Sequence, residues 1–527
     1  MDIGLLDKFK SILHSEDVIT DYNQIVKLSS DLNNIIPPPQ YPFCILRPNS
    51  IDQLSYIVQI ASAYKIPLVV RGAGTTSSGG LSLDVSNFVM IDMRLLDQIE
   101  EINEKDMYVT VQAGCTWEKV YKELKIIGFR PTCCGFGDGL LGTIGGSASD
   151  NNLLAGYQTH GMFSNNILSM DIVLSNGSIL ETGSAAADGR VPFLRDYGPD
   201  LTGLFIGDAG ALGIKARVSF KIARESKVNK FLSFSFKRIE DLVSAQVELA
   251  RSNINLEHWG IDTFNNSKLF GQNIEITRTK NEKKIFLASS ISQDLAPGVR
   301  SFSHSHFFLN IMIGGNNVDE VRNTSSLVIQ ICNPFILSEV ENNLGYYFEN
   351  LSFGPLRNDK SKDAFDYVAT NSLFPLSRAE EIAAITDEYF IRHCDIIKNN
   401  NISYSYLTSA SKNSFFIEPR LWWRVYENDK KNNKRILNIA LELSRDLSVL
   451  WDTFGALHFQ IGRFYNFENQ LSTAARSSLE LVKSVFDPNY IMNPGVLGLV
   501  DKNKVRKSES RYPEFPQDLL DDQNDVI

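Results

Sequence analysis

A glycine-rich loop is the first feature of the chain that could do chemistry. It runs from Arg71 to Gly80 with the sequence RGAGTTSSGG, and it directly follows an apolar run at 68–70 that we read as a buried strand. Glycine lets the backbone turn so that successive amides point into one hollow, and such a hollow binds phosphate oxygens. The hydroxyl groups of the loop add further donors. We therefore expect this loop to bind a pyrophosphate.

Two common phosphate-binding motifs do not fit the loop. The dinucleotide fingerprint GxGxxG needs a glycine at position 77, where Ser77 stands, and a helix afterwards, whereas we expect a strand. The P-loop needs Gly-Lys-Ser/Thr at its end, which is absent. A nicotinamide enzyme is therefore disfavoured. Taken alone, the loop could also be an ordinary solvent-exposed turn.

Three further clusters argue against an ordinary turn. GTIGGS at 142–147 is followed by the polar stretch SDNN at 149–152. LFIGDAGALGI occupies 204–214, and DPNYIMNPG occupies 487–495. Each cluster could be a turn by itself, but their joint order and spacing are hard to obtain by chance.

With these clusters the chain resembles the FAD-linked oxidases, the p-cresol methylhydroxylase and vanillyl-alcohol oxidase fold group. Within that group it is most similar to the branch of D-lactate dehydrogenases and the FAD subunit of glycolate oxidase. The resemblance covers 41–224, weakens through 225–450 and returns at 455–500. It implies an α+β fold, in which a two-part FAD-binding domain of the p-cresol methylhydroxylase type carries an α+β substrate domain, or cap, over the flavin.

The resemblance assigns each cluster a part of the cofactor. The first loop would hold the pyrophosphate, the Thr-Ile-Gly-Gly stretch would pass the isoalloxazine and ribityl, and the third cluster would close over the adenosine side. The fourth cluster would return near the flavin. The positions so implied are Arg71, Gly72, Ala73, Gly74, Thr75, Thr76, Gly79, Gly80, Gly142, Thr143, Ile144, Gly145, Gly146, Ser149, Asn151, Gly207, Asp208, Gly210, Gly213, Ile214 and Asn493.

We expect the FAD to be bound non-covalently. Family members that tether FAD through the first loop have a histidine where Thr75 and Thr76 stand here. Doubly tethered members have a cysteine just before the second cluster, where this chain has Leu140 and Leu141. The adjacent Cys133 and Cys134 lie upstream, and we interpret them as structural.

Flavin reduction needs a substrate C–H aimed at the ring and a group that takes the hydroxyl proton, and an acidic substrate also needs a cation. The segment LHFQIGRFY at 457–465 offers all of these. On a strand His458, Gln460 and Gly462 would share one face. We assign His458 as candidate base, with a packed core histidine as the alternative. Arg463 and Tyr465 are candidate anchors or polarisers.

Other residues offer weaker candidates. Arg420, in EPRLWW, could bind an anion or could stack on Trp422 or Trp423. Tyr404 and Tyr406 could line the cap, although core packing is the simpler interpretation. His160 follows the second cluster and could lie near the flavin.

No metal site is expected. The D-lactate branch often has a His-x6-His segment and a Glu-His pair, and neither occurs here. His304 and His306 on a strand would point to one face, but they lack further ligands at a fixed spacing. The third cluster also departs from the family, with Asp208-Ala209 where Ser-Glu is commoner. Membership of a metal-assisted subgroup is therefore not implied.

Helical and strand patterns place these motifs in the chain. Ser50 and Gln53 form a capping box, and Asn176-Gly177 predicts a two-residue hairpin turn within 169–182. Helical periodicity covers 238–251, 378–398, 431–451 and 470–486. We divide the chain into an N-terminal helical segment (1–40), the FAD-binding domain (41–224), the cap (225–455), a C-terminal return (456–506) and an acidic, mobile tail (507–527).

Composition sets the remaining limits. The 527 residues are 43% hydrophobic and 22% charged, with a net charge of −10, which is typical of a globular chain of two or three domains and disfavours nucleic-acid binding. A local basic patch at Lys280, Lys283 and Lys284 is more simply a solvated loop. The six cysteines form no CxxC pair, and no secretory signal or membrane span is recognisable. A cytoplasmic protein, free or peripheral to a membrane, is expected.

These observations favour an FAD-dependent oxidoreductase that acts on the CH–OH group of a small 2-hydroxyacid by hydride transfer to flavin. A neutral or phenolic alcohol is an alternative substrate. A third hypothesis is a flavin-binding subunit of a larger oxidase without turnover of its own. The electron acceptor could be oxygen, a quinone, a cytochrome or a partner flavoprotein, and a homo-oligomer remains an option.

Overall fold

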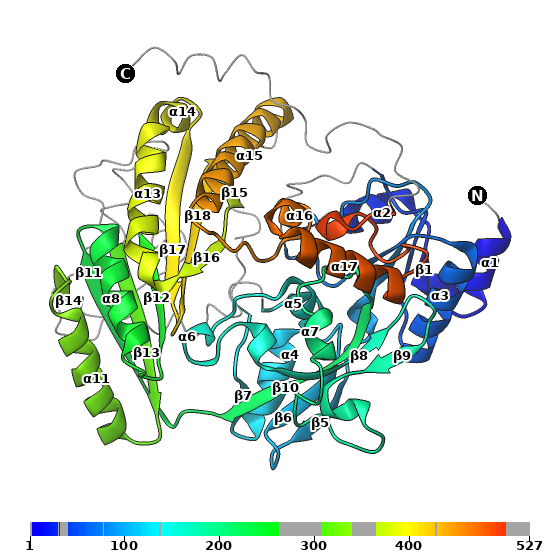
Figure 1. Ribbon diagram of the computed structural model, residues 1–527, viewed down its shortest axis with the longest axis horizontal. Helices are drawn as coiled ribbons and strands as arrows, with labels where there is room; N and C mark the ends of the chain where they lie inside the picture. Colours follow the sequence, from blue (N-terminus) through cyan, green and yellow to red (C-terminus); the bar gives the residue numbers. More distant parts are fainter. Residues whose placement is uncertain are drawn as a thin grey trace.

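Three β-sheets follow one another along the chain in a computed structural model that describes residues 3–29, 31, 40–76, 78–135, 139–262, 307–339, 365–426 and 429–501. Figure 1 shows the first two sheets at the N-terminal side of the molecule and the third sheet, with its helices, at the other side. The lysine patch at 280–284, the His304–His306 pair and the tail 507–527 lie outside the described residues.

The first sheet is small and mostly parallel. Its strand order is β1-β2-β4-β3, formed by Val18–Ile19, Cys44–Leu46, Val89–Asp92 and Leu68–Arg71 respectively. Only the β1–β2 pair is antiparallel. The N-terminal segment was expected to be helical, and it does form α1 (Ile3–Lys10) and α2 (Tyr22–Leu28), but it also contributes β1 because burial of two adjacent β-branched residues favours a strand.

Helix α3 (Ile51–Tyr64) connects β2 to β3, and its start confirms the capping signal. Ser50 Oγ accepts a hydrogen bond from the Gln53 amide at 3.2 Å. The return bond goes to the amide of Asn49, at 2.9 Å from Gln53 Oε1, rather than to that of Ser50. The N-terminal capping interaction of α3 fixes where this helix begins. It therefore also helps to position the loop that follows β3.

The second sheet is antiparallel. Its main order is β5-β6-β10-β8-β9, with β7 also paired to β10. Helix α4 (Trp117–Ile126) and the seven-residue α5 (Ile144–Asp150) pack on it, and Trp117, Phe163 and Phe220 meet edge to face in its core. The strands are β5 (Ile99–Asn103), β6 (Tyr108–Gln112), β7 (Phe129–Pro131), β8 (Ile167–Val173), β9 (Ile179–Glu181) and β10 (Ile214–Arg224).

The hairpin between β8 and β9 is present, but the predicted two-residue turn is wrong. Val173 pairs with Ile179, and the amide of Leu174 donates to Ser178 O at 2.9 Å, which leaves a three-residue loop. Only Gly177 has a positive φ, of 84°. A three-residue loop needs its single left-handed residue at the end, whereas the two-residue turn would also require Asn176 to be left-handed.

The third sheet lies within the range expected for the cap, and we call it the cap sheet. Its order is β14-β11-β13-β12-β17-β18-β15, with β16 also paired to β18. β10 ends at Arg224 and β11 begins at Val228, next to the division expected after 224. The strands are β11 (Val228–Phe236), β12 (Glu257–Asp262), β13 (Phe307–Gly315), β14 (Ser338–Glu339), β15 (Phe365–Ala369), β16 (Ser372–Pro375), β17 (Ile402–Ala410) and β18 (Ser414–Arg424).

Helices cover one face of the cap sheet (Figure 1). They are α8 (Ile239–Arg251), α11 (Val318–Cys332), α13 (Ala379–Arg392), α14 (Cys394–Asn399) and α15 (Lys430–Asp452), so the helical pattern at 378–398 becomes two helices. Tyr404 and Tyr406 point to this side, where Tyr404 stacks on Phe390 with ring centroids 4.6 Å apart. Both tyrosines therefore pack in the core of the cap.

The opposite face of the cap sheet is turned toward the second sheet. The short α6 (Tyr157–His160) lies between them and holds them together. The Tyr157 hydroxyl lies 2.7 Å from Ser414 Oγ, and Gln158 Nε2 donates to His258 O at 2.6 Å. The cap face carries Trp259 and Phe416 into the same apolar cluster as Tyr157.

The C-terminal segment returns to the first two sheets. After the cap come α16 (Phe467–Gln470) and α17 (Thr473–Phe486), and Phe486 of α17 packs on Phe205, which directly follows α7 (Leu201–Leu204). The chain then docks on β3, where the Leu68 amide donates to Ile491 O at 2.7 Å. No helix in the described part of the chain is long and apolar enough to cross a membrane.

A buried ion pair fixes this return. Lys483 Nζ lies 2.6 Å from Asp487 Oδ2 and also donates to the carbonyls of Ala211 and Met492, at 2.7 and 2.8 Å. Burial lowers the pKa of Lys483, although the charge of Asp487 opposes that shift. The lysine thus joins α17, the third glycine cluster and the strand-like segment at 491–492.

Lys483→Ala should destabilise the protein strongly. It would leave the carboxylate of Asp487 buried without its counter-charge, and breaking such a pair lowers the free energy of unfolding by about 3–5 kcal/mol. Lys122→Ala is the matched control, because it removes the exposed i,i+4 pair with Glu118 and should change stability by less than about 1 kcal/mol. Urea denaturation measures both, and equal effects of the two variants would contradict the interpretation.

Candidate active site

A cavity lies between the glycine clusters and the open face of the cap sheet, and it holds roughly 1560 Å³ of empty space, its open mouth included. One side, the glycine wall, comprises lining residues of the first three clusters. The other side, the cap wall, comprises Trp259, Tyr367, Ala369, Asn371, Leu407, Phe416, Glu418, Arg420, Phe459 and Gln460. The structure thus brings segments from all three sheets to one site.

Most of the expected cofactor contacts line this cavity. They are Gly72, Ala73, Gly74, Thr75, Thr76, Gly80, Gly142, Thr143, Gly145, Gly146, Ser149, Gly210, Gly213 and Ile214. Others support the wall without lining it, namely Arg71, Gly79, Ile144, Asn151, Gly207, Asp208 and Asn493. Lys215, Asp150 and Asn152 line the cavity and were not expected.

The first loop offers donors that suit a phosphate. Within the described part of the chain, nothing accepts a hydrogen bond from the backbone N–H groups of Gly72, Ala73 and Gly74, three successive residues beside the cavity. Arg71 lies beneath them, where its Nη2 donates to Ala73 O at 2.8 Å. Burial, together with the nearby Arg94, lowers the pKa of Arg71 to about 10. A nest of amides above a guanidinium fits a pyrophosphate.

The second cluster uses its glycines for close packing. Thr143 caps α5 by accepting from the Gly146 amide at 3.3 Å. The amides of Ile144 and Gly145 already donate to the carbonyls of Cys115 and Ala113. A Cβ on Gly145 would lie 2.6 Å from the Cβ of Ala113, so only glycine lets the helix approach β6 so closely. The second cluster therefore shapes the cavity wall through close packing, while its amides at Ile144 and Gly145 are used within the protein.

The third cluster is a turn held by a carboxylate. Asp208 accepts from the amides of Gly210 and Leu212 at 2.9 and 3.1 Å, and it forms a buried ion pair with Lys215. Asp208 stands where the family commonly has serine, and here it fixes the turn internally. Lys215 then lines the cavity with its charge balanced.

A clasp formed by Arg463 and Asn493 connects the clusters. Asn493 Nδ2 donates to Gly80 O at 3.1 Å and to Ala209 O at 2.7 Å. Arg463 Nη2 donates to Asn493 Oδ1 at 2.7 Å, and the Arg463 amide donates to Ser78 O at 2.8 Å. Arg463 therefore holds the first loop to the third cluster, and it is not among the residues that line the cavity.

The segment at 457–465 is not the strand that we expected. Leu457 makes one isolated bridge to Leu373, after which Gln460 and Gly462 have positive φ angles of 53° and 50°. Gly462 lies against Ser78, so that a Cβ there would come within 2.6 Å of the serine Cβ. Left-handed residues break the alternation of a strand, and the predicted sharing of faces does not hold.

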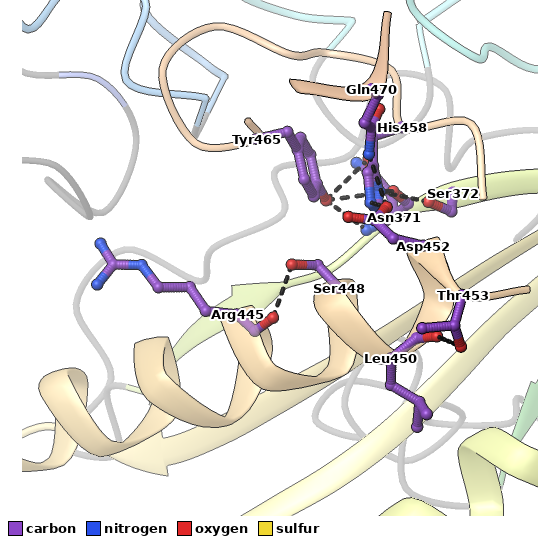
Figure 2. A network of polar contacts seen from close by, with 10 residues as sticks. All are labelled: Asn371, Ser372, Arg445, Ser448, Leu450, Asp452, Thr453, His458, Tyr465 and Gln470. Atoms are coloured by element: carbon purple, nitrogen blue, oxygen red, sulfur yellow. Dashed lines mark hydrogen bonds and ion pairs between the residues drawn. The ribbon is translucent and has the colours of Figure 1, made fainter. Parts of the chain in front are cut away.

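His458 is not among the residues that line the cavity, and Figure 2 shows it beside Ser372, Asp452 and Tyr465. Its Nδ1 is 2.5 Å from Ser372 Oγ, its Nε2 is 3.0 Å from Asp452 Oδ1, and its ring stacks on Tyr465 at 4.0 Å. Burial lowers the pKa of His458, although its hydrogen-bond partners, Asp452 among them, oppose the shift. With both ring nitrogens engaged and no place in the cavity lining, the imidazole does not reach a ligand there.

His458 and Tyr465 act instead on Asn371. The Tyr465 hydroxyl accepts from the Asn371 amide at 2.8 Å and donates to Asn371 O at 3.2 Å (Figure 2). Asn371 Nδ2 donates to Gln460 Oε1 at 3.0 Å, and Gln460 Nε2 donates to Asn152 Oδ1 at 2.9 Å. This chain of amides crosses from the cap wall to the glycine wall, so the two residues determine how the walls face each other.

Arg420 lines the cavity beside Glu418. Its Nε and Nη2 both lie 2.6 Å from Glu418 Oε1, and its guanidinium carbon lies 5.3 Å from the ring centre of Tyr367. The alternative prediction, in which Arg420 stacks on Trp422 or Trp423, is wrong, because the guanidinium lies over the ring of Tyr367 instead. Burial is the largest single influence and lowers the pKa of Arg420, but the charges of Glu418, Tyr367 and Asp262 and the hydrogen bond to Glu418 together raise it above its usual value.

Sequence reasoning missed Glu418, although a signal was present. In FFIEPRLWW the alternate residues Phe416, Glu418 and Arg420 share one face of β18, as the period of a strand requires. Tyr367, on β15, and Asn371, which follows that strand, carried no such signal, because pairing of β15 with β18 brings this part of the chain to the site.

His160 and the cysteines lie away from the cavity lining. His160 ends α6, and burial lowers its pKa to about 4. Cys133 and Cys134 are buried, and burial raises the pKa of Cys133 to about 12. Over the described ranges, no histidine or cysteine lines the cavity and no three metal-binding side chains gather at one point.

Comparisons with known proteins agree with this architecture. A family model described as an FAD binding domain matches residues 42–183. A probable mitochondrial D-lactate dehydrogenase of Danio rerio is 28% identical over 40% of this chain and 41% of its own length. A mitochondrial D-lactate dehydrogenase (cytochrome) of Saccharomyces cerevisiae is 24% identical over 89% of this chain and 74% of its own.

The structural comparison confirms the expected fold. p-Cresol methylhydroxylase with substrate bound superposes with a TM-score of 0.75 over 95% of this chain and 98% of that one, at 17% identity. The chain therefore has this fold over almost its whole length, and the match to an FAD binding domain covers residues that form most of the first two sheets.

A buried carboxyl group beneath the first loop should make stability depend on pH. Asp31 Oδ2 accepts from the Gly79 amide at 2.8 Å, while Oδ1 has no partner among the described residues. Burial is the main cause that raises the pKa of Asp31 from 3.8 to about 7. The folded apoprotein then holds a proton that the unfolded chain releases, so stability is lost as pH rises from about 4 toward 7.

Asp31→Asn should remove that dependence. Relative to the parent, the variant should gain stability at pH 8 and little at pH 4, with an upper bound on the order of 3–4 kcal/mol. Thermal melts of the apoprotein at the two pH values measure the difference, with Asp188→Asn, an exposed carboxyl, as the control. A gain that is the same at both pH values would contradict a titrating Asp31.

Proposed function

We propose that this chain is an FAD-dependent oxidoreductase that oxidises the CH–OH group of a small 2-hydroxyacid. The proposal starts from the FAD-binding domain, which is of the p-cresol methylhydroxylase type. The FAD-linked oxidoreductase class rests on the family match. The substrate, the roles of individual residues and the non-covalent binding of FAD are our proposals.

The cavity suits FAD bound without a covalent bond. The free amides of Gly72, Ala73 and Gly74 would hold the pyrophosphate, and the close-packed glycines of α5 would let the ring system lie against the wall. The cavity lining contains no histidine or cysteine from the described residues. When bound, FAD supplies an acceptor for the two electrons and one hydrogen of a substrate C–H bond.

Arg420 is the observation that carries the choice of substrate. It is the cation of the cap wall, and its side chain is only 6% exposed. Glu418 occupies Nε and Nη2, whereas Nη1 has no hydrogen-bond partner within the described chain. A buried guanidinium with a free N–H edge is well suited to a carboxylate. The two relatives that are D-lactate dehydrogenases by name support the same substrate class.

A neutral or phenolic alcohol is the second candidate, and the aromatic side chains of the cap wall favour it. Trp259, Tyr367, Phe416 and Phe459 surround the Glu418–Arg420 pair, which is already neutral as a unit. A pair without net charge attracts an anion less than a lone arginine would. The solved structure of similar fold with the name p-cresol methylhydroxylase lends this alternative some support.

Absorbance spectroscopy tests the proposal. Purified protein should be yellow, and acid precipitation should release the colour into the supernatant, since the FAD is non-covalent. Anaerobic D-lactate or glycolate should bleach the flavin, whereas benzyl alcohol should not. Colour retained in the pellet would contradict non-covalent binding, and bleaching by the alcohol alone would favour the second candidate. Reoxidation by oxygen, a quinone or a cytochrome then identifies the acceptor.

Arg420→Lys should weaken hydroxyacid binding while sparing the chemical step. Lysine keeps the charge but loses the fork that serves Glu418 and a carboxylate at once. We expect the concentration of D-lactate or glycolate that half-saturates flavin bleaching to rise about 10-fold or more, in line with the loss of a charged hydrogen bond. Arg378→Lys, in an exposed pair with Glu381 on the cap, is the control and should behave as the parent. Unchanged saturation in Arg420→Lys would contradict the anchoring role.

A further inference from the structure

One carboxylate of the cap wall has no assigned task. The ionisable side chains that line the cavity are those of Asp150, Lys215, Tyr367, Glu418 and Arg420. Lys215 is paired with Asp208, and Asp150 belongs to α5 on the glycine wall. On the cap wall, within the described chain, Glu418 is the carboxylate that faces the space in which a substrate would lie.

The two oxygens of Glu418 have different surroundings. Oε1 accepts a hydrogen bond from Arg420 Nε at 2.6 Å and forms the ion pair with Nη2 at the same distance. No described residue donates to Oε2, although the side chain is only 14% exposed. A carboxylate has about four acceptor positions, so the Glu418 group can accept a further proton donor from the cavity. Arg420 balances its charge, which makes burial of the carboxylate tolerable.

We propose that Glu418 is the catalytic residue that accepts the hydroxyl proton of the substrate, an inference that rests on the proposed oxidation of a 2-hydroxyacid. Glu418 and Arg420 are two residues apart on one face of β18 and are joined by their own hydrogen bonds. In a 2-hydroxyacid the hydroxyl is on the carbon next to the carboxylate. A carboxylate on Arg420 Nη1 therefore brings the hydroxyl close to Glu418.

The step balances with FAD as the oxidant. The substrate O–H bond breaks and its proton passes to Glu418 Oε2. The C–H bond on the same carbon breaks, its hydrogen leaves with the electron pair to FAD, and the carbon–oxygen bond becomes the C=O of a 2-oxoacid. Glu418 afterwards releases the proton to water at the mouth of the cavity. A positioned base of this kind speeds such a step by about 10²–10⁴-fold.

The geometry also distinguishes Glu418 from other bases. His458 is engaged on both ring nitrogens outside the cavity lining, so it positions Asn371 and does not meet the substrate. Tyr367 lies beside Arg420 in the lining and is the rival acceptor of the proton.

The closeness of Glu418 to Arg420 also predicts that 2-hydroxybutyrate is oxidised in preference to 3-hydroxybutyrate. Only 2-hydroxybutyrate has its hydroxyl group on the carbon next to the carboxylate.

Glu418→Gln tests the proposal, because glutamine keeps the shape and a hydrogen bond to Arg420 but cannot take the proton. Anaerobic stopped-flow measurements with D-lactate or glycolate should show flavin reduction slowed by about 10²-fold or more. The dissociation constant for the 2-oxoacid product, pyruvate or glyoxylate, measured from the change in the flavin spectrum on binding, should stay within a few-fold of the parent. Glu381→Gln, in the exposed pair with Arg378, is the matched control and should be unchanged.

The outcomes separate this inference from the proposed function. Flavin in Glu418→Gln that is reduced at the parent rate overturns the inference alone. A parent protein that no hydroxyacid bleaches overturns both. If Glu418→Gln fails to fold, Glu418→Asp and Tyr367→Phe decide, since the shortened carboxylate should slow reduction more than the loss of the Tyr367 hydroxyl does. The reverse ranking would assign the proton to Tyr367 and would overturn the inference.

Discussion

The side-chain amide of Asn493 is the contact on which the glycine wall depends. Its Nδ2 donates to the carbonyl oxygens of Gly80 and Ala209, which lie 413 and 284 residues earlier in the chain. Its Oδ1 accepts a hydrogen bond from Arg463, which lies just before α16. One amide therefore connects three distant segments. Short glycine-rich turns have little side-chain packing to hold them and many accessible backbone conformations. The clasp supplies what they lack, since it holds the end of the first loop, at Ser78 and Gly80, to Ala209 of the third cluster. The C-terminal return, secured by the buried pair of Lys483 and Asp487, is therefore part of the cofactor site.

Three buried ion pairs in the described part of the chain, Lys483–Asp487, Lys215–Asp208 and Arg420–Glu418, differ in which of their atoms remain free. Asp208 uses its oxygens on two amides and on Lys215, which makes the third cluster a closed unit. The Glu418–Arg420 pair uses one carboxylate oxygen and two guanidinium nitrogens. Surroundings of low dielectric constant strengthen any further hydrogen bond to such groups. The Glu418–Arg420 pair, which keeps free polar atoms on a cavity wall, is therefore suited to binding and chemistry. The Asp208–Lys215 pair, whose carboxylate is fully engaged, is suited to a structural role. The amide chain Asn371–Gln460–Asn152 keeps the open pair facing the glycine wall.

Local signals in the sequence predicted much of the fold. The glycine clusters, the cap of α3, the end of α17 at Asp487-Pro488 and the division between the second and third sheets all follow from spacing and residue type. The alternation of the segment at 457–465 resembles a strand, whereas Gln460 and Gly462 adopt left-handed backbone and Gly462 lies against Ser78. The place of His458 depended on Ser372 and Asp452, which no local pattern connects to it. Glu418 is close to Arg420 in the sequence, but its place in the site could not be predicted from that. Pairing of β18 with β15 and β17 places both side chains in the cavity wall that faces the glycine wall.

A crystal structure of the protein with FAD and a bound 2-oxoacid tests the central claim most directly. We expect the FAD pyrophosphate on the amides of Gly72–Gly74, the ligand carboxylate on Arg420 and the ligand carbonyl oxygen within hydrogen-bonding distance of Glu418, with the Arg463–Asn493 clasp unchanged. A ligand whose carboxylate is held elsewhere, or an Arg420 whose free edge is covered by protein when FAD is present, would contradict it.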